Sequence, residues 1–230
     1  MDADGTEPGS GAADADRRLL RARRTRAALA TAAVDLILER GLAATTVEAI
    51  AGRADVTRRT FSRHFTGKED AALGFVRDDG DRINAALRVR PPNEPPLLAY
   101  RRAVAAWLAD RDTPAAHLRP QMRRIVGLLD REPTLFAAYE RIRVDAQEES
   151  VRIVAQRLGT PPEDLRPAVV VEAAAGVLTA ALRAWARGPD EPDGAGTGLA
   201  GLMERAYDAL TREAASAAAH STQEPRTTDL

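Results

Sequence analysis

The sequence of 230 residues contains no cysteine and few aromatic residues. The absence of cysteine excludes a disulfide scaffold, a thiol nucleophile and any zinc site that needs thiolates, and it is typical of a reducing compartment. Only 4% of the residues are aromatic although 44% are hydrophobic, so the core must consist mainly of Ala, Leu and Val. Such a core suits the packing of helices on helices better than a sandwich of sheets. The composition therefore predicts an all-α fold.

Signals for metal binding, membrane insertion and catalysis are also missing. The three histidines are too scattered to predict a metal site, and we expect neither a metal nor a cofactor. The most apolar stretch, residues 168–182, contains a glutamate and is shorter than the about 20 residues of a membrane-spanning helix. No export signal and no catalytic or nucleotide-binding motif is found. We therefore expect a soluble cytoplasmic protein that is not an enzyme.

Charge is segregated along the chain although the formal net charge is only −1. Residues 1–16 carry five acidic and no basic residues, whereas residues 17–68 carry twelve basic and four acidic residues. Residues 69–230 carry 21 basic and 25 acidic residues. A basic block on an otherwise acidic chain favours contact between that block and a polyanion. The alternative is a solvated basic helix face.

Hydrophobic spacing and capping residues divide the basic block into short helices. Gly41 is expected to end the first helix, and Thr57 is expected to cap the third. Three turn residues precede Thr57, and Asp55 among them is expected to adopt the positive φ that such a turn requires. Two short helices joined by three residues, the second of them basic, are typical of a helix-turn-helix. The predicted helices cover residues 17–40, 45–53 and 57–65, and a fourth begins at Gly67.

The third predicted helix carries arginines on one side and phenylalanines on the other. Phe61 and Phe65, four residues apart, are expected to point into the core of the domain. Arginine can donate two hydrogen bonds to guanine in the major groove, and a lysine at a helix start attracts phosphate. The side chains expected on the exposed side are those of Arg58, Arg59, Ser62 and Arg63, with Lys68 following at the start of the next helix.

The segments 45–51, 54–65 and 67–69 resemble the DNA-binding domain of the TetR family of bacterial repressors. They read Thr-Thr-Val-Glu-Ala-Ile-Ala, Ala-Asp-Val-Thr-Arg-Arg-Thr-Phe-Ser-Arg-His-Phe and Gly-Lys-Glu. The resemblance implies an all-α homodimer with a ligand-binding C-terminal domain. This sequence departs from the family pattern at Ser62, where the family usually has an aromatic residue. The resemblance implies phosphate contacts by Thr46, Thr60, His64 and Lys68, and base contacts by Arg58, Arg59 and Arg63.

Prolines and glycines divide the remaining chain into further helices. We expect these over 96–110, 115–131, 133–158, 163–187 and 198–213, with a surface loop over 188–197. The expected architecture is an N-terminal three-helix DNA-binding domain followed by a C-terminal helical bundle that binds a ligand and dimerises. Its parts are a disordered acidic tail (1–16), the DNA-binding domain (17–70), the ligand-binding and dimerisation domain (71–215) and a loose tail (216–230).

Loose patterns in residues 121–159 resemble a TetR branch described as acyl-CoA-like ligand binding, which is associated with mycofactocin-type and related regulators. A pocket inside a helical bundle would suit an apolar or acyl ligand. Glu172 could anchor such a ligand, bond to a second subunit or simply be exposed. The residues expected to line the pocket, unless they are plain core, are Trp107, Met122, Ile125, Leu129, Tyr139, Glu172 and Trp185.

The dimer is expected to form through the last two helices. Residues 168–182 are apolar on nearly every face, so one protomer cannot bury all of them. The final helix adds a second apolar stripe, and two copies of both helices would form a four-helix interface around a two-fold axis. The interface residues expected are Val177, Leu178, Leu182, Leu202, Met203 and Leu210.

The sequence thus predicts a ligand-responsive repressor that binds a palindromic operator as a homodimer in the nucleoid. A small apolar or acyl-type effector would release it from double-stranded DNA. Residues 17–26 contain six arginines and are expected to form a flexible arm that touches the DNA. The alternatives are an activator or a ligand-blind regulator, a helical adaptor that binds an acidic partner, and an enzyme built on the bundle.

Overall fold

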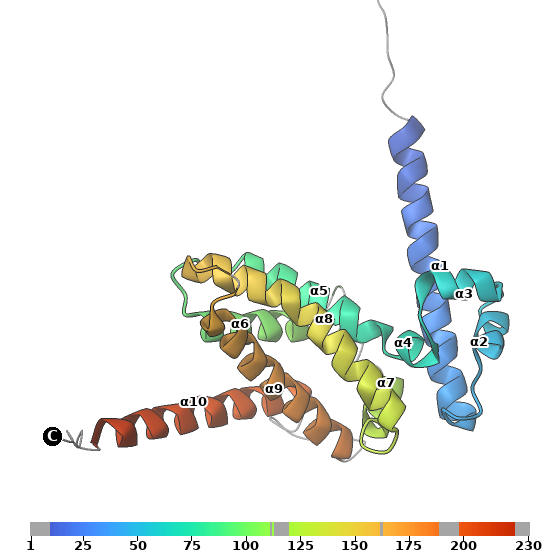
Figure 1. Ribbon diagram of the computed structural model, residues 1–230. Coiled ribbons are helices and arrows are strands. Elements are labelled where there is room, and N and C mark those ends of the chain that lie inside the picture. Colours follow the sequence, from blue (N-terminus) through green and yellow to red (C-terminus); the bar gives the residue numbers. More distant parts are fainter. Residues whose placement is uncertain (1–9, 111, 113–119, 162, 189–197, 224–230) are drawn as a thin grey trace, which may run out of the picture. The chain divides into compact units, whose positions relative to one another are not determined.

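The computed structural model describes residues 10–110, 112, 120–161, 163–188 and 198–223 (Figure 1). These residues form helices joined by turns, without a strand, which confirms the all-α class. The chain divides into two compact units, unit 1 up to Phe75 and unit 2 from Val76. This boundary lies close to the one expected from the sequence, at the start of a helix rather than in a linker.

Unit 1 is a small helical domain around a core of aliphatic and phenylalanine side chains. Its most deeply buried side chains include those of Leu29, Leu36, Ile50 and Phe61, each at most 1% exposed. Gly41 ends the first helix at a φ of +85°, and its N–H donates to the carbonyl of Ile37 at 2.9 Å. The helices are α1 (Ser10–Arg40), α2 (Val47–Arg53), α3 (Arg58–His64) and α4 (Lys68–Ala72).

The start of α1 contradicts two expectations. Residues 10–16 and 17–26 are helical, so a disordered tail is wrong for the former and a flexible arm is wrong for the latter. Ala, Leu and Arg are strong helix formers, and adding residues to a helix already anchored by its core needs no new nucleation. Asp14 also pairs with Arg17 and Arg18, one turn further on. The remainder of the expected tail, residues 1–9, lies outside the described residues.

The helix expected from Gly67 onwards is two helices. A break at Leu73 separates α4 from α5 (Gly74–Arg88), and Leu73 has a φ of −101° and a ψ of 9° there. The Leu73 side chain at the break is fully buried. The next residue, Gly74, lies against Phe65, where an added Cβ would meet a ring carbon at 3.2 Å.

Unit 2 contains the remaining helices, and α9 is central to it. This helix packs against α6, α7, α8 and α10. It is the one described helix that is long and apolar enough to cross a membrane, by length and composition only. Its contacts with four other helices are those of a core helix. The bounds are α6 (Pro96–Ala109), α7 (Pro120–Leu128), α8 (Pro133–Leu158), α9 (Leu165–Arg187) and α10 (Leu199–Gln223).

The end of α10 differs from the expectation, whereas α8 begins and ends as predicted. α10 continues to Gln223, so residues 216–223 are helical and not a loose tail. Ala-rich sequence explains the extension, since alanine has the highest helix propensity. The second half of α10 extends beyond the other helices of unit 2 (Figure 1). The expected surface loop and the expected start of α7 lie largely outside the described residues, which omit 113–119 and 189–197.

Candidate DNA-binding interface and effector unit

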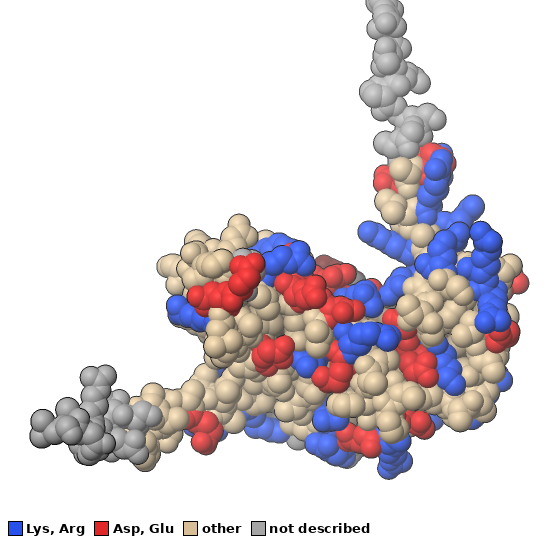
Figure 2. Space-filling view, in the orientation of Figure 1, with Lys and Arg blue, Asp and Glu red and all other residues tan. Residues whose placement is uncertain are grey.

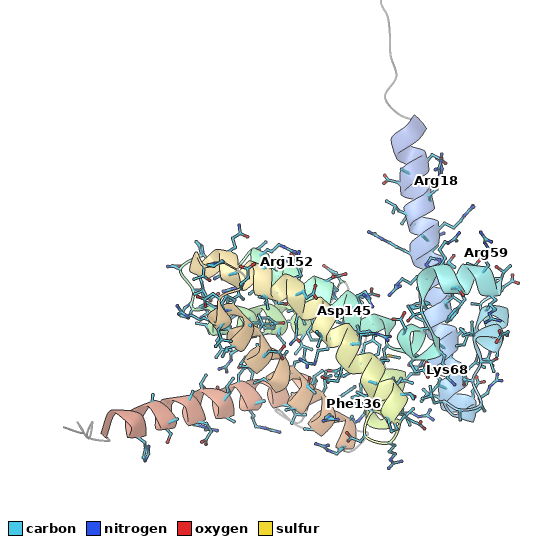
Figure 3. The ribbon with its side chains drawn as sticks, viewed as in Figure 1. Arg18, Arg59, Lys68, Phe136, Asp145 and Arg152 are labelled. Carbon is cyan, nitrogen blue, oxygen red and sulfur yellow. The ribbon has the colours of Figure 1, made fainter. Side chains whose placement is uncertain are left out.

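α3 is fixed by one buried phenylalanine and presents polar side chains on its other side. Phe61 is 1% exposed, and its ring centroid lies 5.8 Å from that of Phe65. Arg58, Arg59 and Arg63 are exposed, and so is Ser62 (Arg59 is labelled in Figure 3). The face expected for base reading is therefore the face that unit 1 leaves open.

The turn before α3 has the geometry of a helix-turn-helix. Asp55 has a φ of +51°, which confirms the expectation for this position. Thr57 caps α3, because its hydroxyl accepts the N–H of Thr60 at 3.1 Å. In the same way, the hydroxyl of Thr46 caps α2 by accepting the N–H of Ala49 at 3.2 Å. Thr46 and Thr60, both expected at phosphates, thus lie at the first turns of α2 and α3.

Arg58 has an acidic partner on the surface of unit 1. Its guanidinium forms an ion pair with Glu48 of α2 at 2.9 Å, and both side chains are mostly exposed, 73% and 59% respectively. An ion pair in water contributes little to stability, about 0–1 kcal/mol. Arg58 can therefore exchange this carboxylate for DNA at small cost. This pair could not be predicted from the sequence because its members lie ten residues apart on different helices.

Lys68 makes hydrogen bonds within unit 1. Its Nζ donates to the carbonyl of Leu42 at 2.7 Å and to that of Thr45 at 3.1 Å. These carbonyls belong to the α1–α2 connection, where Thr45 is buried and its hydroxyl donates to the Gly41 carbonyl at 2.9 Å. Lys68 thus ties α4 to this connection, a role that the sequence analysis missed. A contact with phosphate stays a prediction.

The two hydrogen bonds of Lys68 predict a loss of stability on mutation. Lys68→Met is expected to lower the free energy of unfolding by about 1–2 kcal/mol, because two carbonyls lose a charged donor. Urea unfolding followed by circular dichroism measures this change. If the variant is as stable as wild type but binds all DNA sequences more weakly by the same factor, the Lys68 side chain contacts phosphate and does not stabilise the fold.

His64 lies at the end of α3 in a partly buried place. Burial lowers the pKa of its ring below the ordinary value, and the nearby Arg63 and Arg26 lower the pKa further. Its Nε2 is buried without a hydrogen-bond partner. Arg26 of α1 donates to the His64 carbonyl at 2.9 Å and lies over the Phe65 ring, 4.5 Å from the centroid. Arg26 thereby joins α1 to the end of α3.

Basic side chains of unit 1 gather on two elements. They cover the exposed first half of α1 and the open side of α3 (Figure 2). The basic block found in the sequence is thus a basic surface of a helix-turn-helix domain. Such a surface suits the phosphate backbone of a duplex, and a helix of this size fits the major groove.

In unit 2, most residues expected to line an effector pocket are buried, and two of them form side-chain hydrogen bonds. The Trp107 indole donates to Asp79 at 3.1 Å, and the Tyr139 hydroxyl lies 3.2 Å from that of Thr179. Glu172 is exposed and pairs with Arg143 at 3.2 Å. Met122, Ile125, Leu129 and Trp185 are at most 9% exposed. Their contact with an effector stays a prediction.

A described cavity of unit 2 lies elsewhere, between α6 and α10. Its volume is about 210 Å³, and none of the seven residues expected from the sequence lines it. One end holds Arg101, which pairs with Glu204 and Asp208. Apart from Arg101 and Glu204, the lining residues are Val104, Ala105, Leu108, Ala109, Ala200, Met203 and Tyr207.

Unit 2 also has a buried polar cluster formed by Asn84, Tyr100 and Ser150, and Gln147 is a further buried polar residue on the same helix as Ser150. The Ser150 hydroxyl donates to Asn84 at 2.7 Å and lies 3.4 Å from the Tyr100 hydroxyl. Gln147 is 6% exposed, and its Nε2 has no hydrogen-bond partner. Burial raises the pKa of Tyr100. The sequence analysis missed the cluster, because its members come from three helices.

A capped α2, a positive-φ turn and a basic α3 define a DNA-binding protein of the helix-turn-helix class. Comparison with known families agrees. Residues 29–71 match the family described as bacterial regulatory proteins, tetR family, and residues 94–215 match the MftR C-terminal domain. A curated relative, the HTH-type transcriptional regulator TcmR of Streptomyces glaucescens, is 36% identical over 167 residues, covering 71% of this chain and 74% of the relative.

The chain belongs to the TetR family of bacterial transcriptional regulators. Members of this family are generally ligand-responsive repressors, and they are DNA-binding regulators rather than enzymes. A regulator of this type is expected to be soluble and cytoplasmic.

Proposed function

We propose that this protein is a transcriptional repressor that binds a palindromic operator as a homodimer and is released by a small effector bound in unit 2. The observation that carries the proposal is the open basic face of α3, held by Phe61 and the caps of α2 and α3. A two-fold dimer would present two such helices about 34–36 Å apart, which is one turn of the duplex. Its place of action would be the nucleoid.

The proposed effector is a small molecule with an apolar, acyl-like part. The cavity between α6 and α10 supports this choice, since Val104, Leu108 and Met203 line it. At about 210 Å³ it is smaller than the pockets that enclose drug-sized ligands, so it suits a chain or a single ring. An effector that binds better to a conformer with mis-spaced reading helices would release the DNA. Thermal unfolding in the presence of fatty acyl compounds tests this part, because a bound ligand raises the melting temperature.

Operator binding is tested by removing one reading side chain. Arg59→Ala is expected to weaken binding by about 1–3 kcal/mol and to relax the preference at one base pair, because alanine cannot form the bidentate hydrogen bonds to the base. The probe is a palindromic duplex selected by the wild-type chain from a random pool. Arg152→Ala, which removes an arginine that is 60% exposed in unit 2, is the matched control and should leave binding unchanged (Figure 3).

The same binding measurement distinguishes the proposed repressor from the main alternative, a helical adaptor. An adaptor that uses the basic surface on an acidic protein need not distinguish one duplex from another, so its binding to selected and random duplexes would be equal. If Arg59→Ala lost the same affinity for selected and for random duplexes, that result would contradict base reading by this residue. An activator would bind the duplex as a repressor does, and a transcription assay tells the two apart.

A further inference from the structure

The first half of α1 is a helix that projects from the core of unit 1. Residues 15–24 are all exposed, and the first buried residue from Asp14 onwards is Leu29. Leu19 and Leu20 are 57% and 52% exposed. We define residues 17–26 as the arginine arm; Figure 3 labels Arg18 on it.

The arginine arm has a high charge for its length. It contains six arginines, and no acidic residue occurs between Arg17 and Asp35. Arg17, Arg21 and Arg24 follow helical spacing and share one face, while Arg18 and Arg23 lie on others. The arm is about 15 Å long at 1.5 Å per residue, and the same length of duplex carries about nine phosphates.

The base of the arm is tied to the reading helix. Arg26 is the last residue of the arm, and it binds the His64 carbonyl and covers the Phe65 ring at the end of α3. The arm is also continuous with the anchored part of α1. The direction of the arm is therefore set relative to α3 within unit 1. When α3 lies in a major groove, the arm has one position on the duplex instead of sampling many.

We propose that the arginine arm is a second DNA-binding element, a rigid helix whose arginines contact phosphates that flank the half-site read by α3. The arm lies outside residues 29–71, which match the family's DNA-binding domain, so it adds a contact to that domain. The proposal rests on operator binding as the proposed function. Phosphate contacts carry no sequence information, so the arm adds affinity and salt dependence without changing base preference.

Two observations favour DNA over an anionic membrane as the partner. A membrane-surface helix needs a continuous apolar face, whereas the arginines surround this helix and Leu19 and Leu20 are neighbours in sequence. The arm also belongs to the unit that carries the open basic face of α3. An acidic protein surface offers the same charge as DNA, but it does not repeat at the spacing of a phosphate backbone.

The test replaces the five exposed arginines of the arm, at 17, 18, 21, 23 and 24, with glutamine. Binding is measured over a range of salt concentrations on a selected core duplex of about 20 bp and on the same core with flanks of about 12 bp on each side. On the flanked duplex the affinity is expected to fall about 10- to 100-fold. The slope of log affinity against log salt should become shallower by about 0.9 for each phosphate that the variant no longer neutralises. The core duplex should be bound within about threefold of wild type.

A matched control removes the same charge from unit 2. It replaces five exposed arginines, at 124, 131, 141, 166 and 212, with glutamine and should leave the salt slope unchanged. An unchanged slope in the arm variant overturns the proposal, and so does a slope change of equal size in the control. Loss of binding to vesicles of phosphatidylcholine and phosphatidylglycerol, with DNA binding intact, would assign the arm to a membrane. Failure of the wild type to bind any selected duplex would refute the proposed function instead.

Rigidity is tested separately by Ala22→Pro. A proline in a helix interior breaks or kinks the helix but leaves all six arginines in place. The loss of affinity for the flanked duplex is expected to be nearly as large as in the glutamine variant. Ala22→Leu, with a residue of high helix propensity, should bind as wild type. Residue 22 is exposed and precedes the core, so neither change should alter the melting temperature. Wild-type binding by Ala22→Pro would contradict a rigid arm.

Discussion

A chain carrying Gly176→Arg is expected to be a folded monomer that binds a palindromic duplex at least about 100-fold more weakly than wild type. Gly176 lies on the exposed side of α9, and an added Cβ would meet nothing within 4 Å. An arginine there can be accommodated by the protomer, and it replaces a glycine that disfavours the helix. In a dimer formed through α9, the same side chain would bring a charge into the interface. A monomer reaches only one half-site, and linked binding is worth about 10²–10⁴ in affinity.

The exposed side of α9 is largely apolar apart from Glu172, which pairs with Arg143, and it supports this choice of position. Leu165 and Val169 are 76% and 55% exposed, and Ala180 is exposed further along the same side. Small residues at 176 and 180 allow a second helix to approach closely. α10 packs beside α9, and its Leu202 and Leu210 remain partly exposed. These side chains offer the surface for the four-helix interface that we propose.

Light scattering measures whether the Gly176→Arg chain is a monomer, and circular dichroism measures whether it is folded. Gly176→Ala is the control and should stay dimeric. Val177→Arg makes a contrast, because Val177 is only 7% exposed within the protomer and a buried unpaired charge should unfold the chain. A wild-type chain that is a stable monomer at micromolar concentration would contradict the dimer and the palindromic operator together.

The interface residues expected from the sequence divide into buried and partly exposed side chains, and a dimer through α9 and α10 stays a prediction. Val177, Leu182 and Met203 are at most 8% exposed in a single protomer, whereas Leu178, Leu202 and Leu210 are partly exposed. An almost wholly apolar helix gives no polar face from which its inner side could be identified. That side depends on which helices pack around α9, and helical spacing does not contain this information.

Local chemistry made the DNA-binding unit more predictable than unit 2. Caps at Thr46 and Thr57 and the positive φ of Asp55 follow from residue type alone. The ion pair of Arg58 with Glu48 and the hydrogen bonds of Lys68 depend on how different helices meet. The exposed basic face of α3 could therefore be predicted from the sequence, whereas the hydrogen bonds of Lys68 to carbonyls could not.

The helical start of α1 was missed for a related reason. A stretch dense in like charges and without core residues is typical of a disordered arm. High helix propensity and a covalent link to an anchored helix outweigh the repulsion between arginines here, with help from Asp14. The same arginines can serve a flexible or a rigid arm, and only the structure distinguishes the two.

Phe61→Ala is expected to abolish operator binding by loosening unit 1 while unit 2 stays folded. Phe61 is 1% exposed and joins α3 to the core beside Phe65. Truncating a buried phenylalanine costs about 3–5 kcal/mol, because a cavity remains where the ring was. A small domain has a total stability of about 5–15 kcal/mol, so this cost is a large part of what holds α3 in place.

Hydrogen exchange distinguishes a loosened unit 1 from the removal of a side chain that touches DNA. In Phe61→Ala, the amides of α2 and α3 should exchange at least about 100-fold faster, as a loss of 3 kcal/mol requires, while those of α8 and α9 keep their protection. Phe136→Ala, a partly exposed phenylalanine of unit 2 that lies against Arg183, is the matched control and should leave operator binding intact (Figure 3). Full protection of α3 in a variant that no longer binds the operator would mean that Phe61 contacts the DNA, against its burial in the core.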